Sequence, residues 1–124
     1  MPRARGPILV VEDDEDVSEA LRDTLAEAGY ETAAVMDGQD AIEYLRSHPA
    51  PPLILLDWNM ARMNGPQLMA EVAKEPSLSS VPIVLMTADT RVADKVRALG
   101  RVRYLKKPVD LNALFEVVGE YCGD

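Results

Sequence analysis

Short apolar runs alternate five times with amphipathic segments, and this alternation is the feature that most limits how the chain can fold. The apolar runs predict strands at residues 8–11, 31–35, 53–57, 82–86 and 102–105. The segments after them carry apolar residues at helical spacing and predict helices at residues 16–28, 39–47, 66–74, 91–99 and 110–121. Because the strands are continuously apolar rather than apolar at every second residue, we expect helices on both faces of the sheet.

Alternating strands and helices predict an α/β fold built on a five-stranded parallel sheet. The 124 residues fit one domain, which we expect to span residues 1–124. Right-handed crossovers leave few ways to wind such a sheet, and the commonest is the flavodoxin-like strand order 2-1-3-4-5. Ligands of these sheets bind outside the carboxyl ends of the strands, where the winding reverses between strands one and three.

Charge is unevenly distributed along the chain, whose formal net charge is −8. Nine acidic residues lie between Glu12 and Glu31 against one base, Arg22, whereas seven of the thirteen basic residues lie between Arg91 and Lys107. The acidic excess argues against direct binding to nucleic acid. Each charged region is consistent with ordinary solvated surface or with a binding face.

The single cysteine, Cys122, excludes a disulfide framework within the chain and favours a reducing compartment. No apolar run reaches the roughly 20 residues that span a bilayer. The first seven residues are not followed by an apolar segment of signal-peptide length. The sequence therefore predicts a cytoplasmic protein with no membrane contact.

Charged residues stand at the carboxyl ends of three predicted strands. Glu12 and Asp13 follow the first strand, Asp57 ends the third, and Lys107 follows the fifth. Neighbouring strands lie ~4.8 Å apart, so we expect the carboxylates to be close together, with Lys107 paired to Asp57. Their mutual repulsion favours a bound cation, and hard oxygen ligands without His or Cys point to Mg²⁺. With the hydroxyl of Thr87 facing the same pocket, these groups suit phosphoryl transfer.

Five short motifs accompany this pattern. They are Val10-Val11-Glu12-Asp13-Asp14, Leu55-Leu56-Asp57-Trp58-Asn59-Met60, Met63-Asn64-Gly65, Met86-Thr87-Ala88 and Tyr104-Leu105-Lys106-Lys107-Pro108. Each alone is weak, but together, at these spacings, they resemble the receiver domain of the two-component response-regulator family, and stand-alone chemotaxis-type regulators in particular. The resemblance covers essentially the whole chain. Two departures are Met60-Ala61, where Met-Pro is frequent, and Arg101, where a small residue usually follows the glycine.

The resemblance implies a role for each acid at the predicted sheet edge. Asp57 would be the phosphoacceptor and a metal ligand, and Asp13 would be a direct ligand of Mg²⁺. Glu12 would bind the ion through water, and the backbone carbonyl of Asn59 would be a further ligand. Asp14 is expected to be structural or at the surface, because adjacent side chains of a strand point in different directions.

The resemblance also implies that Thr87 and Lys107 contact the phosphoryl group and that Tyr104 is an aromatic switch residue. Two plainer interpretations remain open: Thr87 could cap the following helix, and Tyr104 could be a packing aromatic. The peptide bond between Lys107 and Pro108 is expected to be cis, as is usual in the family.

The expected function is a phosphorylation-controlled switch rather than an enzyme that turns over an external substrate. A sensor histidine kinase or phosphotransfer protein would phosphorylate Asp57, and the face made by the fourth helix, fifth strand and fifth helix would then control a downstream target protein. Five bases are assigned to this face: Arg91, Lys95, Arg97, Arg101 and Arg103. We expect them to dock an acidic partner or the acidic last helix of a second copy, so that the protein is a monomer or a weak homodimer.

Two other function classes remain open. A magnesium-dependent phosphohydrolase would also use an aspartyl nucleophile, but such enzymes commonly carry Asp-x-Asp, whereas Trp58 and Asn59 follow Asp57. A flavodoxin-like cofactor binder would need a phosphate-binding loop after the first strand, where this chain carries acids. The ends of the chain favour a stand-alone receiver over a piece of a longer protein.

Overall fold

The computed structural model describes residues 6–58, 65–89, 91, 94 and 103–122. Its five strands are β1 (Ile8–Val11), β2 (Thr32–Val35), β3 (Ile54–Asp57), β4 (Ile83–Thr87) and β5 (Arg103–Lys106). Its helices in these residues are α1 (Glu15–Glu27), α2 (Gly38–Ser47), α3 (Gly65–Lys74) and α5 (Leu111–Cys122). Each bound lies within one residue of the sequence prediction. The predicted helix at residues 91–99 lies outside the described residues except for Arg91 and Asp94.

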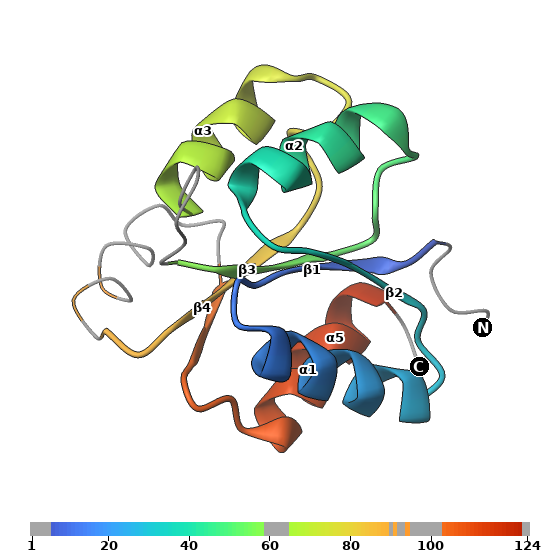
Figure 1. Cartoon of the computed structure of the whole chain (residues 1–124), viewed down its shortest axis with the longest axis vertical. Coiled ribbons are helices and arrows are strands. Elements are labelled where there is room, and N and C mark those ends of the chain that lie inside the picture. Colours follow the sequence, from blue (N-terminus) through green and yellow to red (C-terminus); the bar gives the residue numbers. More distant parts are fainter. Residues whose placement is uncertain (1–5, 59–64, 90, 92–93, 95–102, 123–124) are drawn as a thin grey trace.

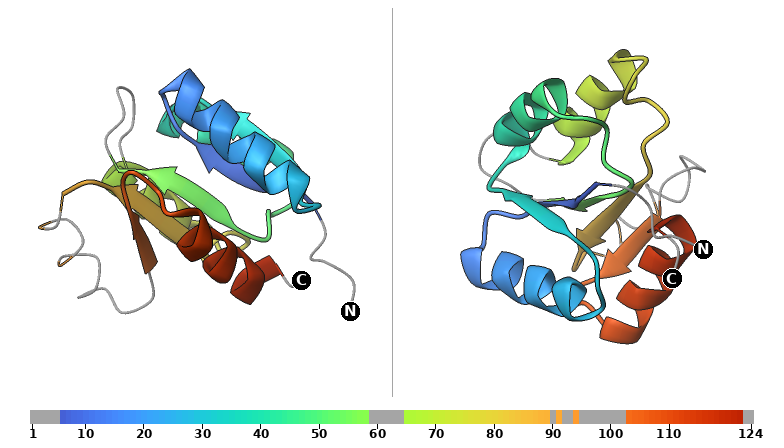
Figure 2. Two further views of the ribbon diagram at one scale, coloured as in Figure 1. Left: turned by 90° about the horizontal axis from the view of Figure 1, so that it is seen from below. Right: turned by 90° about the vertical axis from the view of Figure 1, so that its right-hand side faces the viewer.

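The strands form one parallel sheet in the order β2-β1-β3-β4-β5, which confirms the predicted α/β fold. Helices α2 and α3 cover one face, and α1 and α5 cover the other (Figures 1 and 2). The carboxyl ends of the strands all lie at one edge of the sheet, as parallel pairing requires.

Two apolar cores lie on opposite faces of the sheet because side chains alternate along each strand. The α1–α5 core joins strand residues such as Val10, Leu55 and Leu105 to Leu21, Leu25, Leu114 and Val118 of the helices. The α2–α3 core joins Leu9, Val11, Ile54, Leu56 and Leu85 to Ala41, Ile42, Leu68 and Val72. The same alternation determines whether the side chain at the end of each strand lies on the α1–α5 side or on the α2–α3 side of the sheet.

Local signals determine where the first two helices begin and where the first one ends. Asp14 caps α1 by accepting hydrogen bonds from the backbone amides of Asp16 and Val17, and Asp37 caps α2 through the amide of Asp40. Gly29 follows α1 with φ of 92°, a left-handed conformation that glycine adopts without strain. Within the described residues, no helix is long and apolar enough to cross a membrane.

Candidate functional site

The strand register brings two of the predicted acids together. Val11 of β1 pairs with Leu56 of β3, so Glu12 and Asp57 are the next residues on these two neighbouring strands. The amide of Glu12 continues the sheet by donating to the carbonyl of Val35 at 3.2 Å. Glu12, Asp13 and Asp57 each offer a carboxylate oxygen, and these oxygens lie within 4.8 Å of one another. The predicted acidic cluster is therefore present at the sheet edge.

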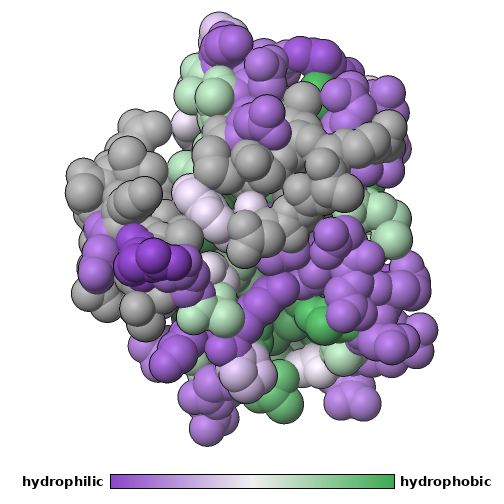
Figure 3. Space-filling view, turned by 60° about the vertical axis from the view of Figure 1, so that its left-hand side comes forward, coloured by the Kyte–Doolittle hydropathy of each residue, from purple (hydrophilic) through white to green (hydrophobic). Residues whose placement is uncertain are grey.

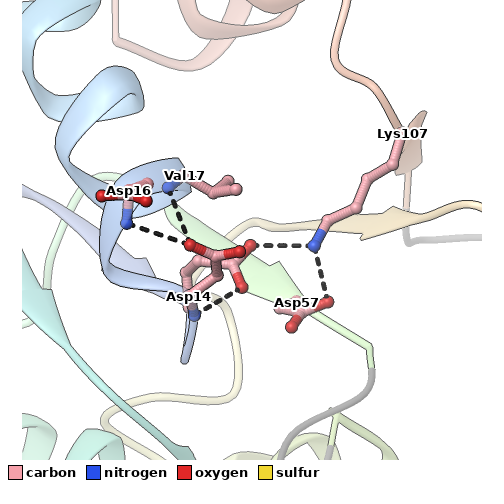
Figure 4. Close-up of polar contacts among 6 residues, drawn as sticks. Asp14, Asp16, Val17, Asp57 and Lys107 are labelled. Atoms are coloured by element: carbon pink, nitrogen blue, oxygen red, sulfur yellow. Dashed lines mark hydrogen bonds and ion pairs between the residues drawn. The ribbon is translucent and has the colours of Figure 1, made fainter.

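Lys107 reaches this cluster from β5, on the far side of β4 (Figure 4). Its ammonium donates to Oε1 of Glu12 at 2.8 Å and to Oδ1 of Asp57 at 3.1 Å. The backbone amide of Lys107 donates to the carbonyl of Thr87 at 2.9 Å, and the peptide bond to Pro108 is cis, as predicted. The sequence indicated the pair with Asp57 but missed the shorter contact with Glu12.

Side-chain alternation explains why these three groups meet. The residues two positions earlier on their strands all lie in the α1–α5 core: Val10, Leu55 and Leu105. Glu12, Asp57 and Lys107 therefore continue the α1–α5 side of the sheet at its carboxyl edge. Register and alternation together were a signal from which the contact between Glu12 and Lys107 could have been found.

The charged state of Lys107 depends on its partners. Burial has the largest single influence on the pKa of Lys107 and lowers it, but the hydrogen bonds to Glu12 and Asp57 and the charges of both acids together raise the pKa above its ordinary value of 10.5. The Lys107 side chain is 26% exposed, whereas Glu12 is 1% and Asp57 5% exposed. Lys107 is therefore charged at neutral pH, and its one positive charge is shared between two buried carboxylates.

The Asp14 side chain is used to cap helix α1. Its Oδ1 accepts from the amides of Asp16 and Val17 at 3.0 and 3.3 Å (Figure 4). Its own backbone amide donates to Oε2 of Glu12 at 3.2 Å. The structural role predicted for the Asp14 side chain is confirmed, and its backbone contributes to the position of Glu12.

Thr87 ends β4 as a buried residue at the same edge. Its Oγ1 accepts a hydrogen bond from the amide of Asp89 at 3.0 Å, and Oδ1 of Asp89 accepts from the amide of Arg91 at 2.9 Å. These turns support the plainer, cap-like interpretation of Thr87. Because its oxygen is the acceptor, the hydroxyl hydrogen can still be donated, and a contact with a phosphoryl group stays a prediction.

Comparison with known proteins settles the family. The sequence profile described as the response regulator receiver domain matches residues 8–119. The chain belongs to this family. The receiver is 29% identical over 126 residues to the polar-differentiation response regulator DivK of Brucella anthropi, covering 100% of this chain and 99% of DivK.

Solved structures agree with the fold of this receiver. The receiver domain of a signal transduction histidine kinase from Syntrophus aciditrophicus superimposes with a TM-score of 0.80 at 34% identity, over 94% of this chain and 89% of that one. Chemotaxis protein CheY4 of Vibrio cholerae gives 0.84 at 25% identity, over 95% and 99%. A Mn(2+)-bound form of response regulator Rcp1 gives 0.75 at 29% identity, over 96% and 91%.

The donor set of the receiver fits a hard divalent cation. All three groups of the cluster are carboxylates, and Lys107 is the one base bonded to them in the described part of the chain. Three carboxylates and one ammonium leave two formal negative charges. Oxygen ligands and this excess charge match Mg²⁺, which binds one or two carboxylates and keeps several waters. Asn59, the further predicted ligand, lies outside the described residues.

Two aromatic residues of the receiver belong to the α2–α3 core. Trp58 and Tyr104 are both partly buried and pack against that core. The amide of Trp58 donates to the carbonyl of Met86 at 3.1 Å, which fixes the backbone directly after Asp57. The packing role of Tyr104 is therefore present in the structure, while its switch role stays a prediction.

Two of the five bases assigned to the partner face are described, and each is paired within the chain. Arg91 bonds Asp89 at 3.2 Å, and Arg103 forms an ion pair with Glu120 of α5. Lys95, Arg97 and Arg101 lie outside the described residues. The sequence predicted that the acidic last helix, which includes Glu120, could be bound by a second copy, but it did not predict this pair within the chain because β5 and α5 meet only in the folded chain.

Proposed function

We propose that this single receiver domain accepts a phosphoryl group from a phosphohistidine donor onto Asp57 and thereby switches its contacts with other proteins. The observation that carries the proposal is the position of Asp57, nearly buried and bonded to Lys107 beside two further carboxylates. A phosphoacceptor site needs a fixed carboxylate, a cation site and a positively charged side chain that can bind the added phosphoryl oxygens. These groups provide all three.

The transfer forms one bond and breaks one. A carboxylate oxygen of Asp57 attacks phosphorus, the bond from phosphorus to the donor imidazole nitrogen breaks, and that nitrogen keeps the electron pair. The ammonium of Lys107, already 3.1 Å from Oδ1 of Asp57, can donate to a phosphoryl oxygen as charge moves toward Asp57. Bound Mg²⁺ would neutralise charge on the phosphoryl oxygens and lower the repulsion among the acids.

The ion would be held by Asp13 and Asp57 directly, by Glu12 through water and by the backbone carbonyl of Asn59. The Mn(2+)-bound form of the similar regulator Rcp1 supports a divalent cation in this fold. The same site would later admit water for hydrolysis, so the domain would catalyse its own phosphorylation and dephosphorylation without turning over an external substrate.

The proposed output is a change of the face that includes β5 and α5. Phosphorylation adds up to about two negative charges, which Lys107 and Thr87 would approach. Tyr104, next to Leu105 on β5, would transmit the change by moving between two packed positions. A sensor histidine kinase or phosphotransfer protein would be the donor, and a downstream target protein or a second copy would bind the changed face.

Phosphorylation by a small molecule tests the proposal without a known partner. The native chain and Asp57→Asn are incubated with acetyl phosphate and Mg²⁺, and the intact mass is measured with and without EDTA. We expect one added phosphoryl group on the native chain, lost with EDTA or with Asp57→Asn. An adduct that persists in Asp57→Asn would contradict the assignment. Beryllofluoride binding, followed by Trp58 fluorescence, should show the same dependence on Mg²⁺ and on Asp57.

A further inference from the structure

The three carboxylates of the site differ in how many of their oxygens the chain already uses. Both oxygens of Glu12 accept hydrogen bonds, Oε1 from Lys107 at 2.8 Å and Oε2 from the Asp14 amide at 3.2 Å. Asp57 accepts from Lys107 through Oδ1. Asp13 is exposed and makes no hydrogen bond or ion pair with the residues that the structure describes. Asp13 and Asp57 can therefore turn oxygens toward an ion at lower cost than Glu12.

Burial makes the contact between Glu12 and Lys107 hard to give up. Glu12 is 1% exposed, and a buried carboxylate needs a partner of opposite charge and hydrogen bonds to both oxygens. The Asp14 amide fixes one oxygen from the start of α1, which leaves the other aimed at the ammonium. Every buried side-chain nitrogen or oxygen in the described residues has a hydrogen-bond partner. Glu12 is thus a fixed anchor, whereas the longer bond to Asp57 is the one that can be exchanged.

Sheet order shows why Lys107 needs an anchor. Strand β5 is separated from β1 by β4 and β3, so the backbones of Glu12 and Lys107 lie three strand spacings apart, roughly 14 Å. An unrestrained lysine at a strand end would extend into water, where its many rotamers are accessible. The carboxylate of Glu12 holds the ammonium over the end of β3, where Asp57 lies.

We propose that Glu12 is the positioning residue of Lys107: it holds the ammonium beside Asp57 and acts on phosphoryl transfer through Lys107, while Asp13 and Asp57 provide the direct oxygen ligands of the cation. The inference rests on the proposed function and assigns Glu12 a task beyond contact with the ion through water. During transfer, Lys107 keeps its bond to Glu12 and exchanges the one to Asp57 for a phosphoryl oxygen.

A double-mutant cycle separates this role from metal binding. Beryllofluoride affinity in excess Mg²⁺ is measured by Trp58 fluorescence for the native chain, Glu12→Gln, Lys107→Met and the double variant. We expect Glu12→Gln to weaken binding about tenfold when Lys107 is present and less than about twofold in the Lys107→Met chain. Equal losses in both backgrounds would overturn the proposal, because Glu12 would then act independently of the ammonium. Lys106→Met, at the exposed neighbouring lysine, is the matched control and should leave affinity unchanged.

A measurement on the native chain keeps the test independent of how the variants fold. Carboxyl carbon shifts are followed by NMR as Mg²⁺ is added. We expect the chemical shifts of the side-chain carboxyl carbons of Asp13 and Asp57 to change along a common saturation curve. The shifts of the Glu12 carboxyl carbon and of the Asp14 amide should change much less. A change in the Glu12 carboxyl shift as large as that of Asp13 would overturn the proposal. A native chain that binds Mg²⁺ but no beryllofluoride would remove the proposed function itself, an outcome distinct from a failed cycle.

Discussion

The ammonium of Lys107 lies 3.1 Å from Oδ1 of Asp57, although the strands that carry these two residues are not neighbours in the sheet. The lysine crosses the end of β4 to reach β3. Figure 3 brings the side of the molecule that carries this edge forward, and most of the coloured residues on this face are hydrophilic, in purple. The long side chain of Lys107 therefore adds a positive charge to a site at which the strand ends alone would place only mutually repelling acids.

Loss of the ammonium should destabilise the fold. Lys107→Met leaves Glu12 buried without its charged partner, so we expect the free energy of unfolding to fall by about 1–3 kcal/mol, discounted for the 26% exposure of the lysine side chain. Urea unfolding at pH 7 measures the change. Lys106→Met, at an exposed residue, should stay within about 0.5 kcal/mol. Equal stability of the two variants would show that the buried acid finds another partner.

Loss of one acid should have the opposite effect in metal-free buffer. Asp13 adds repulsion to the cluster and bonds none of the described residues, so Asp13→Asn should raise the free energy of unfolding by about 0.5–1 kcal/mol at low salt. Mg²⁺ at a hundred times its Kd should stabilise the native chain by about 2.7 kcal/mol. The same concentration should stabilise Asp13→Asn much less. Thermal unfolding with and without Mg²⁺ checks both effects, and equal stabilisation of both chains would contradict the site.

The sequence predicted the order of the elements well because the signals for it are local. Apolar runs, Gly29 after α1 and the proline-rich segment before β3 delimit the elements, and right-handed crossovers limit how they can be wound. The gathering of Glu12, Asp13 and Asp57 follows from that order alone.

The partners of individual side chains were harder to predict because they depend on register and on side-chain reach. The bond from Lys107 to Glu12 needs the alignment of four strands, and the pair between Arg103 and Glu120 needs the packing of α5 on the sheet. For Thr87, the sequence offered two roles, and the local turn with Asp89 occupies its oxygen in the structure.

Alkaline pH should weaken the fold through Cys122. Burial raises the pKa of this thiol above its ordinary value of 9.0, so the unfolded chain loses the proton at lower pH than the folded one. Stability from this group is fully present below pH 9.0 and falls as pH rises through the folded pKa, by up to about 1.4 kcal/mol per pH unit. Urea unfolding between pH 8 and 10 should show a shallower fall for Cys122→Ala than for the native chain. Parallel curves for the two chains would contradict the assignment.

Charge reversal should separate Arg97 and Arg101 of the proposed partner face from Arg103, which forms an ion pair within the chain. Arg103 is already neutralised by Glu120, with 40% and 47% of the two side chains exposed, so Arg103→Ala should change unfolding by less than about 1 kcal/mol and docking little. The double reversal Arg97→Glu and Arg101→Glu should weaken docking to an acidic surface.

Sedimentation velocity of the chain with beryllofluoride and Mg²⁺ measures docking to a second copy, with Arg103→Ala as the control. We expect the double reversal to raise the dissociation constant of the dimer at least tenfold, and the native dimer to weaken with salt. An unchanged dimer would place the contact on another face, and a native chain that stays monomeric would leave an acidic partner of another kind as the ligand of these bases.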